Sequence, residues 1–266
     1  MYNGYDFVYN GKSSISENVK MLYTEPNPFE FTKSIPDKDI SLFTTSRSGK
    51  WDISGVITPE PLSFQMQIMI HSDDEDLYAN GNPYIRRNRI SSISHWLFDN
   101  TDFKRLQIFT EDLRDMYFMA IFKDVEYFEA GGDVCGFRAT VLCDTIGAYE
   151  DKAIYKTCSG ITTLGLQCLH DGIYEVTPTY KIKLTGTAVS ITVNDKTMQF
   201  KSLTEGSTIT VDTETLIVTS DANDNLYIGD RFNLVFPTFH YGKNTITVDG
   251  DCELEIDYKL IREVGC

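Results

Sequence analysis

The sequence predicts a mainly β protein with one amphipathic helix, arranged in two domains. Apolar and polar residues alternate in many short runs, which is typical of strands with one buried and one solvated face. Turn-forming residues separate these runs about every 8 to 12 residues, as in β-sandwiches and barrels. The chain has 266 residues, which is more than most single domains contain.

The clearest strands of the first half lie at residues 62–70 and 135–143. In the first of these, Ser63, Gln65 and Gln67 separate five apolar residues: Leu62, Phe64, Met66, Ile68 and Ile70. In the second, alternate positions from Cys135 to Cys143 share one face. Eight residues of strand separate these two thiols by roughly 26 Å, so we expect no disulfide between them.

One segment has the period of a helix instead. Ile90, Ile93 and Leu97 recur at helical spacing beside Trp96, and they follow the basic stretch of Arg86, Arg87 and Arg89. We therefore predict an amphipathic helix that packs Ile93, Trp96 and Leu97 onto a sheet of the first domain.

We place the domain boundary between Gly147 and Gly160, where large apolar residues are few and no period is clear. The expected domains are residues 1–154 and 155–266. In the second domain, Ile182 and Leu184 precede a break at Gly186, and Asn194-Asp195 forms a hairpin turn before Met198 and Phe200. Further strands are expected around residues 209–211, 216–218, 226–228, 246–248 and 254–260, the last sharing its buried face with Cys252.

The composition argues against several classes of protein. The net charge of -15 disfavours binding to phosphate backbones, which draws its affinity from Lys and Arg, so we expect no sequence-specific nucleic-acid ligand. The longest apolar runs fall far short of the roughly 20 residues of a membrane-spanning helix. Six cysteines without a CxxC spacing, and an N-terminus without the pattern of a secretory signal, fit a reduced compartment.

The chain lacks familiar catalytic motifs such as GxSxG and HExxH. Its histidines, His71, His95, His170 and His240, are scattered along the sequence. Cys168, His170 and Asp171 bring a thiol, an imidazole and a carboxylate together but lack the second ligand pair of a zinc site. We expect no catalytic, cofactor or metal site, although 39 acidic residues leave a carboxylate pair for glycoside hydrolysis open.

Two acidic segments imitate cation sites. The run Asp73-Asp74-Glu75-Asp76 follows a strand and is expected to form a solvated turn. Asp221, Asn223 and Asn225 occupy the alternating positions of a calcium loop. Leu226 replaces the turn glycine and Phe232 replaces the bidentate Glu, so we interpret this segment as a turn as well.

A saccharide site requires an aromatic platform flanked by polar groups. Both tryptophans, Trp51 and Trp96, lie in the first domain. In the second domain the candidates are Tyr227, Phe232, Phe239 and Tyr241, although residues of these types more often pack in a core or cover a hairpin.

Many short segments, in order along nearly the whole chain, resemble the distal tail proteins (Dit) of long-tailed, non-contractile bacteriophages. In the first half they include FVYNGKSSISENVKML, SRSGKWDISGVITPEPLSFQMQI, the helix ISSISHWLF and the strand FRATVLCDTIGAY. In the second half they are VTPTYKIKLTG, NLYIGDRFNLVFPTFHYGKNTITVDG and CELEIDYKL.

This resemblance implies a tail-tube-like β-sandwich or barrel at residues 1–154 and a galectin-like β-sandwich at residues 155–266. It implies a structural virion protein at the tail tip, assembled in the cytoplasm of the host bacterium. Six copies would form a ring around the DNA channel, between the tail tube protein and a lysin-like hub protein of the tail tip. The alternative is a carbohydrate-binding module that adsorbs to the host wall.

Overall fold

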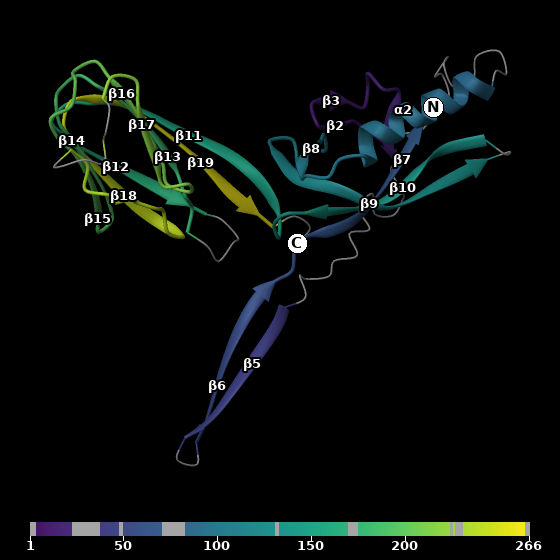
Figure 1. Ribbon diagram of the computed structural model, residues 1–266, viewed down its shortest axis with the longest axis horizontal. Helices are drawn as coiled ribbons and strands as arrows, with labels where there is room; N and C mark the ends of the chain where they lie inside the picture. The colour runs from purple at the N-terminus through teal and green to yellow at the C-terminus, as the bar shows by residue number, and fades with distance from the viewer. Residues whose placement is uncertain are drawn as a thin grey trace. The chain divides into compact units, whose positions relative to one another are not determined.

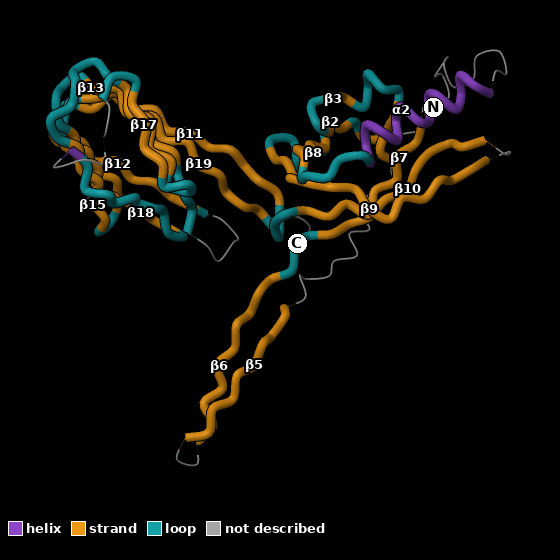
Figure 2. Tube along the Cα trace, in the orientation of Figure 1, coloured by secondary structure: helices purple, strands orange, loops and turns teal. Residues whose placement is uncertain are grey.

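The computed structural model describes residues 4–22, 38–47, 50–70, 83–130, 133–169, 175–223, 226 and 231–263 (Figure 1). The chain divides into two compact units, Met1–Tyr149 with Glu263–Cys266, and Glu150–Arg262, here called unit 1 and unit 2. Strands make up most of the described residues (Figure 2), so the predicted mainly β class is confirmed.

The strands of unit 1 form an antiparallel sheet in the order β1-β4-β7-β10-β9, with β8 beside β9, β2 beside β8 and β3 beside β2. Their bounds are Gly4–Tyr5 (β1), Phe7–Tyr9 (β2), Lys12–Ser13 (β3), Val19–Leu22 (β4), Ser63–Ile70 (β7), Lys104–Ile108 (β8), Met116–Ala130 (β9) and Asp133–Cys143 (β10). The strand expected at residues 62–70 is β7, and it buries Phe64, Met66, Ile68 and Ile70 as predicted.

The predicted helix is α2, Pro83–Phe98, and it packs on the core of unit 1. Ile93 and Leu97 are fully buried, and the Trp96 ring stacks on Phe7 with 5.8 Å between ring centroids. The helix also includes the three arginines that were expected to precede it. It begins at Pro83, because proline is well accommodated in the first turn, where no earlier residue supplies a hydrogen-bond partner for its nitrogen.

Two further strands, β5 (Lys38–Arg47) and β6 (Lys50–Pro59), form a separate two-stranded antiparallel sheet. Their register pairs ten residues of each strand, from Lys38 opposite Pro59 to Arg47 opposite Lys50. We call this element the hairpin.

Unit 2 is a β-sandwich. One sheet has the order β11-β19-β13-β16-β17 and the other β12-β18-β14-β15, and residues of both sheets form one buried core. The bounds are Ala148–Cys158 (β11), Ile161–Cys168 (β12), Thr179–Leu184 (β13), Val189–Val193 (β14), Lys196–Phe200 (β15), Thr208–Asp212 (β16), Ile217–Ser220 (β17), Gly242–Asp249 (β18) and Cys252–Arg262 (β19).

The hairpin turn expected at Asn194-Asp195 connects β14 to β15, with Val193 opposite Lys196. Asn194 has a left-handed backbone conformation, with a φ of 53°. Asparagine tolerates this conformation better than other side chains, which is why it favours two-residue hairpin turns. The break expected at Gly186 is the connection between β13 and β14. Of the strand expected at 226–228, residues 227 and 228 lie outside the described residues.

The expected boundary between residues 154 and 155 falls inside β11. The absence of a period there reflects the exposure of most of this strand, so that no single face is marked by apolar residues. Ile154 packs against the core of unit 2, and Glu150 pairs with Arg262 at 2.9 Å, so the segment just before the expected boundary belongs to unit 2.

All five cysteines in the described ranges are free thiols, and all but Cys135 are buried. The prediction that Cys135 and Cys143 do not bridge each other is confirmed. Cys252 is buried on the same face as Leu254, Ile256, Tyr258 and Leu260, as its position in the pattern predicted.

Candidate functional site

The histidines that the structure describes lie in different units. His95, on the exposed side of α2, contacts Asp99, and His240 lies 3.3 Å from Glu175. His71, His170, Asp171 and the acidic run 73–76 lie outside the described residues, whereas Cys168 is fully buried. Within the described ranges, no group of three or more His, Cys, Asp or Glu residues is placed to hold a metal ion.

In the segment that resembles a calcium loop, Asp221 and Asn223 have structural roles. Asn223 is buried, its Oδ1 accepts a hydrogen bond from the Thr204 amide at 2.8 Å, and its Nδ2 donates to Ser207 Oγ at 2.7 Å. Asp221 Oδ1 accepts from the Thr208 amide at 2.8 Å. The side chains of Asp221 and Asn223 therefore stabilise the loop at residues 204–208 through hydrogen bonds. Asn225 lies outside the described residues.

The aromatic candidates for a saccharide platform separate into core and surface. Trp96, Phe232 and Phe239 are buried, whereas Tyr241 is 67% exposed. Tyr227 lies outside the described residues, and Trp51 lies on β6 opposite Ser46. No helix in the described ranges is long and apolar enough to cross a membrane.

The hairpin is the first candidate for a surface that binds another chain. Neither β5 nor β6 pairs with any other strand of the described residues. An isolated two-stranded hairpin is only marginally stable in water, and its two outer edges present unpaired N–H and C=O groups. The hairpin is therefore suited to pairing or packing with another chain.

The register of the hairpin also separates its residues into two faces. Positions on one face are mostly apolar and come from both strands: Ile40 opposite Ile57, Leu42 opposite Gly55, Thr44 opposite Ile53, and Ser46 opposite Trp51. The other face is mostly polar, with pairs such as Thr45 opposite Asp52 and Arg47 opposite Lys50. An amphipathic pattern of this kind is expected of a strand pair that covers an apolar surface.

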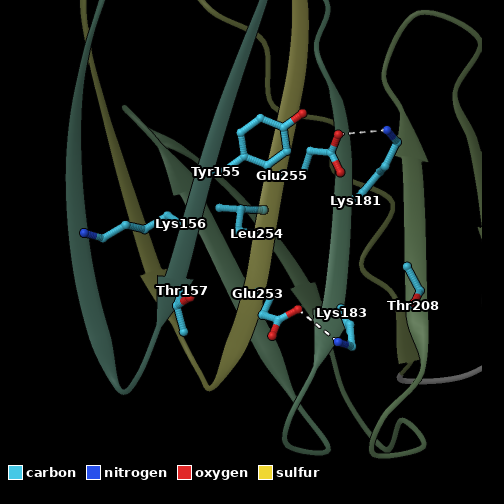
Figure 3. Close-up of a pocket in the computed structure, with 9 residues that line it drawn as sticks. All are labelled: Tyr155, Lys156, Thr157, Lys181, Lys183, Thr208, Glu253, Leu254 and Glu255. Carbon is cyan, nitrogen blue, oxygen red and sulfur yellow. Dashed lines mark hydrogen bonds and ion pairs between the residues drawn. The ribbon is translucent and has the colours of Figure 1, made fainter.

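The second feature is a groove of about 440 Å³ on the sheet of unit 2 that contains β11, β19, β13 and β16 (Figure 3). Its lining includes Tyr155 of β11, Glu253 and Glu255 of β19, Lys181 and Lys183 of β13, and Thr208 of β16. The β13 register explains the arrangement, because Lys181 is opposite Glu255 and Lys183 is opposite both Glu253 and Thr208.

The charged side chains of the groove are paired. Lys181 Nζ lies 3.1 Å from Glu255 Oε1 and 2.8 Å from Asp257 Oδ2, and Lys183 Nζ lies 3.0 Å from Glu253 Oε2. Hydrogen bonds to Asp257 and Glu255 raise the pKa of Lys181 above its ordinary value, so this lysine stays charged at neutral pH.

Tyr155 is the large exposed aromatic residue of this groove. It is 71% exposed, and the neighbouring Glu255 carboxylate raises the pKa of its hydroxyl. The alternation of apolar residues gave no sign of this position, because β11 buries few of its side chains. Tyr155 was therefore absent from the aromatic candidates drawn from the sequence.

Solved structures of phage proteins are among those that are similar to this chain. The SPP1 Dit (gp 19.1) protein, described as a paradigm of the hub adsorption apparatus in phages that infect Gram-positive bacteria, matches with a TM-score of 0.62 and 10% identity, over 97% of this chain and 100% of that chain. A chain of the phage P2 baseplate in its activated conformation with Ca matches with a TM-score of 0.48 and 12% identity, over 99% of each chain.

Sequence comparison identifies the family. No curated protein matches the chain. The profile of the family described as phage tail protein N-terminal domain matches residues 2–145, and that of the phage tail C-terminal domain matches residues 150–258. The resemblance to distal tail proteins that was read from the sequence is confirmed, and the chain belongs to this family of phage tail proteins.

Proposed function

We propose that the protein is a distal tail protein, six copies of which form a ring that joins the tail tube to the host-adsorption apparatus at the tail tip. The family assignment and the fold shared with the SPP1 Dit protein support this role. In this proposal unit 1 is the tail-tube-like, ring-forming domain and unit 2 is the galectin-like domain. The protein is then a component of the virion, made in the host cytoplasm, and its function is structural.

The observation that carries the proposal is the hairpin. A cyclic ring requires a heterologous interface, in which one patch of each subunit meets a different patch on the next subunit. The hairpin offers such a patch, because its strands pair only with each other among the described residues and its apolar positions share one face. A neighbouring copy that paired with an edge of the hairpin would satisfy its open N–H and C=O groups.

The charge of the chain fits a channel for DNA. A net charge of -15 per subunit amounts to a strongly acidic ring. Acidic surfaces repel the phosphate backbone, so a duplex would pass through such a ring without being held. The partners in this proposal are five further copies, the tail tube protein above and the tail-tip hub protein below, with no sequence-specific contact to the DNA and no insertion into a membrane.

The test is electron microscopy of the purified protein, alone and mixed with tail tubes. Hollow rings with sixfold symmetry are expected. The double variant Ile40→Lys and Ile57→Lys places two charges on the apolar face of the hairpin and should leave folded monomers. The matched control is Ser41→Lys with Thr58→Lys on the other face, which adds the same two charges and should retain rings. Parental protein that never forms a hollow ring, in either condition, would overturn the proposal.

A second candidate function is adsorption to carbohydrate of the host wall. The groove beside Tyr155 favours it, because an exposed aromatic ring lies there among hydrogen-bonding side chains. The two functions are compatible, since the first depends on the hairpin of unit 1 and the second on a surface of unit 2.

A further inference from the structure

The geometry points to the groove of unit 2 as a binding site for a neutral saccharide, with the ring of Tyr155 as its platform. This inference rests on the second candidate function, and it names both the residues and the class of ligand.

The form of the surface suits a sugar ring. A pyranose presents an apolar face of C–H groups and a rim of hydroxyls, and it binds best where an aromatic ring lies next to polar side chains. Tyr155 is 71% exposed, and its ring lies beside the carboxylate of Glu255 (Figure 3).

The hydrogen-bonding groups form rows across neighbouring strands. Lys183 of β13 is opposite Glu253 on one side and Thr208 on the other, and Lys181 is opposite Glu255 two residues away. Such rows repeat about every 4.8 Å across a sheet. Carboxylates accept hydrogen bonds, ammonium groups donate them and hydroxyls do both, so the rows can bind several sugar hydroxyls together.

The charge of the groove selects a neutral ligand. Lys181 and Lys183 each have a carboxylate within 3.1 Å, so their charges are largely compensated. Lys156, although it lines the groove, points away from the other side chains (Figure 3). The chain as a whole carries a net charge of -15 and repels polyanions. A neutral polysaccharide is therefore favoured over a phosphate-rich teichoic acid.

A protein partner is a weaker interpretation of the same surface. Protein interfaces are depleted of charged residues at their centre and concentrate their energy in clustered aromatic and arginine side chains. Here a single tyrosine lies among ion pairs. We therefore commit to the saccharide and treat the protein partner as an outcome of the test.

The experiment is affinity electrophoresis of the full chain in native gels that contain a soluble neutral glucan, galactan or mannan, or a poly(glycerol phosphate) teichoic acid. Retardation is expected with at least one neutral polysaccharide and not with the teichoic acid. Tyr155→Ala should weaken binding at least tenfold, whereas Tyr155→Trp should retain it. Tyr241→Ala is the matched control, because Tyr241 is also exposed and lies in the same unit, and it should bind like the parent.

The outcomes separate the inference from the functions on which it rests. Retardation that survives Tyr155→Ala but is lost in Tyr241→Ala overturns the site and leaves carbohydrate binding in place. Parental protein that binds no neutral polysaccharide, or only teichoic acid, overturns the inference. A protein partner would also overturn the inference. In that case the parent binds no glycan, and Tyr155→Ala no longer binds the tail tube protein or the hub protein. Ring formation by Tyr155→Ala, observed in the same preparation, shows that the variant is folded and that assembly is unaffected.

Discussion

The side-chain amide of Asn194 donates a hydrogen bond of 2.9 Å to Oδ1 of Asn244, although fifty residues separate the two in sequence. Asn244 is fully buried. Its Oδ1 also accepts from the His240 amide at 2.9 Å, and its Nδ2 donates to the carbonyl oxygens of His240 at 2.8 Å and Gly242 at 3.2 Å. The carboxamide of Asn244 therefore connects the turn at the start of β18 to the turn between β14 and β15.

Replacing Asn244 should destabilise unit 2. Asn244→Ala leaves half-buried backbone groups of His240 and Gly242 without these partners, so we expect a loss of about 2–4 kcal/mol in the free energy of unfolding. Urea denaturation measures this loss. Lys243→Ala, at the exposed neighbouring position, is the control and should change stability by less than about 0.5 kcal/mol. Equal stability of the two variants would contradict the structural role of the carboxamide.

Trp96 should stabilise unit 1 through both its ring and its nitrogen. Its Nε1 donates to the carbonyl oxygen of Tyr9 at 2.9 Å, and its ring stacks on Phe7. Trp96→Phe removes the hydrogen bond and should cost about 1–2 kcal/mol. Trp96→Ala also leaves a cavity and should cost about 3–5 kcal/mol. Thermal or urea unfolding ranks the variants, and a Phe variant as stable as the parent would show that the hydrogen bond contributes nothing.

The free thiols should differ in reactivity. Burial raises the pKa of the Cys252 thiol to about 12 and also raises the pKa of Cys143, so neither forms much thiolate at pH 8. Cys135, on the same strand as Cys143, is only half-buried. We expect iodoacetamide to label Cys135 well before Cys143 and Cys252, as followed by peptide mass spectrometry. Labelling at similar rates in the native protein, as in the urea-denatured control, would contradict the burial.

Glu150 should make unit 2 sensitive to acid. Burial disfavours its charged form, but hydrogen bonds from Lys152 and Arg262 outweigh burial and hold the pKa of the carboxyl below its ordinary value. A carboxyl whose pKa is lower in the folded than in the unfolded state stabilises the protein above about pH 4.3, and this contribution is lost as the pH falls through the folded value. Glu150→Gln should therefore be less stable than the parent at pH 7, and the difference should shrink below pH 4 in urea titrations.

The start of unit 2 can be tested with fragments. A fragment of residues 150–263 retains Ile154 in the core and the pair of Glu150 with Arg262, whereas a fragment of residues 155–263 loses both. We expect the longer fragment to unfold at a higher urea concentration. Similar midpoints would place the boundary at residue 155, where the sequence pattern had suggested it.

The local elements that depend on period and turn chemistry could be predicted from the amino-acid sequence. The alternation from Phe64 to Ile70, the helical spacing of Ile93 and Leu97, and the turn at Asn194 each carry their signal within a few neighbouring residues. These elements could be predicted because burial of one face imposes its period directly on the sequence. The order of many such segments was also enough to indicate the family.

The pairing of strands that are distant in the sequence became known from the fold. Nothing near Tyr155 in sequence indicates that Glu255 and Lys181, which contact each other 74 positions apart, belong to the same groove. The strand pairing likewise shows that, among the described strands, β5 and β6 pair only with each other. The physical reason is that a periodic pattern records which face of a strand is buried, whereas functional surfaces arise from the order in which distant strands pair.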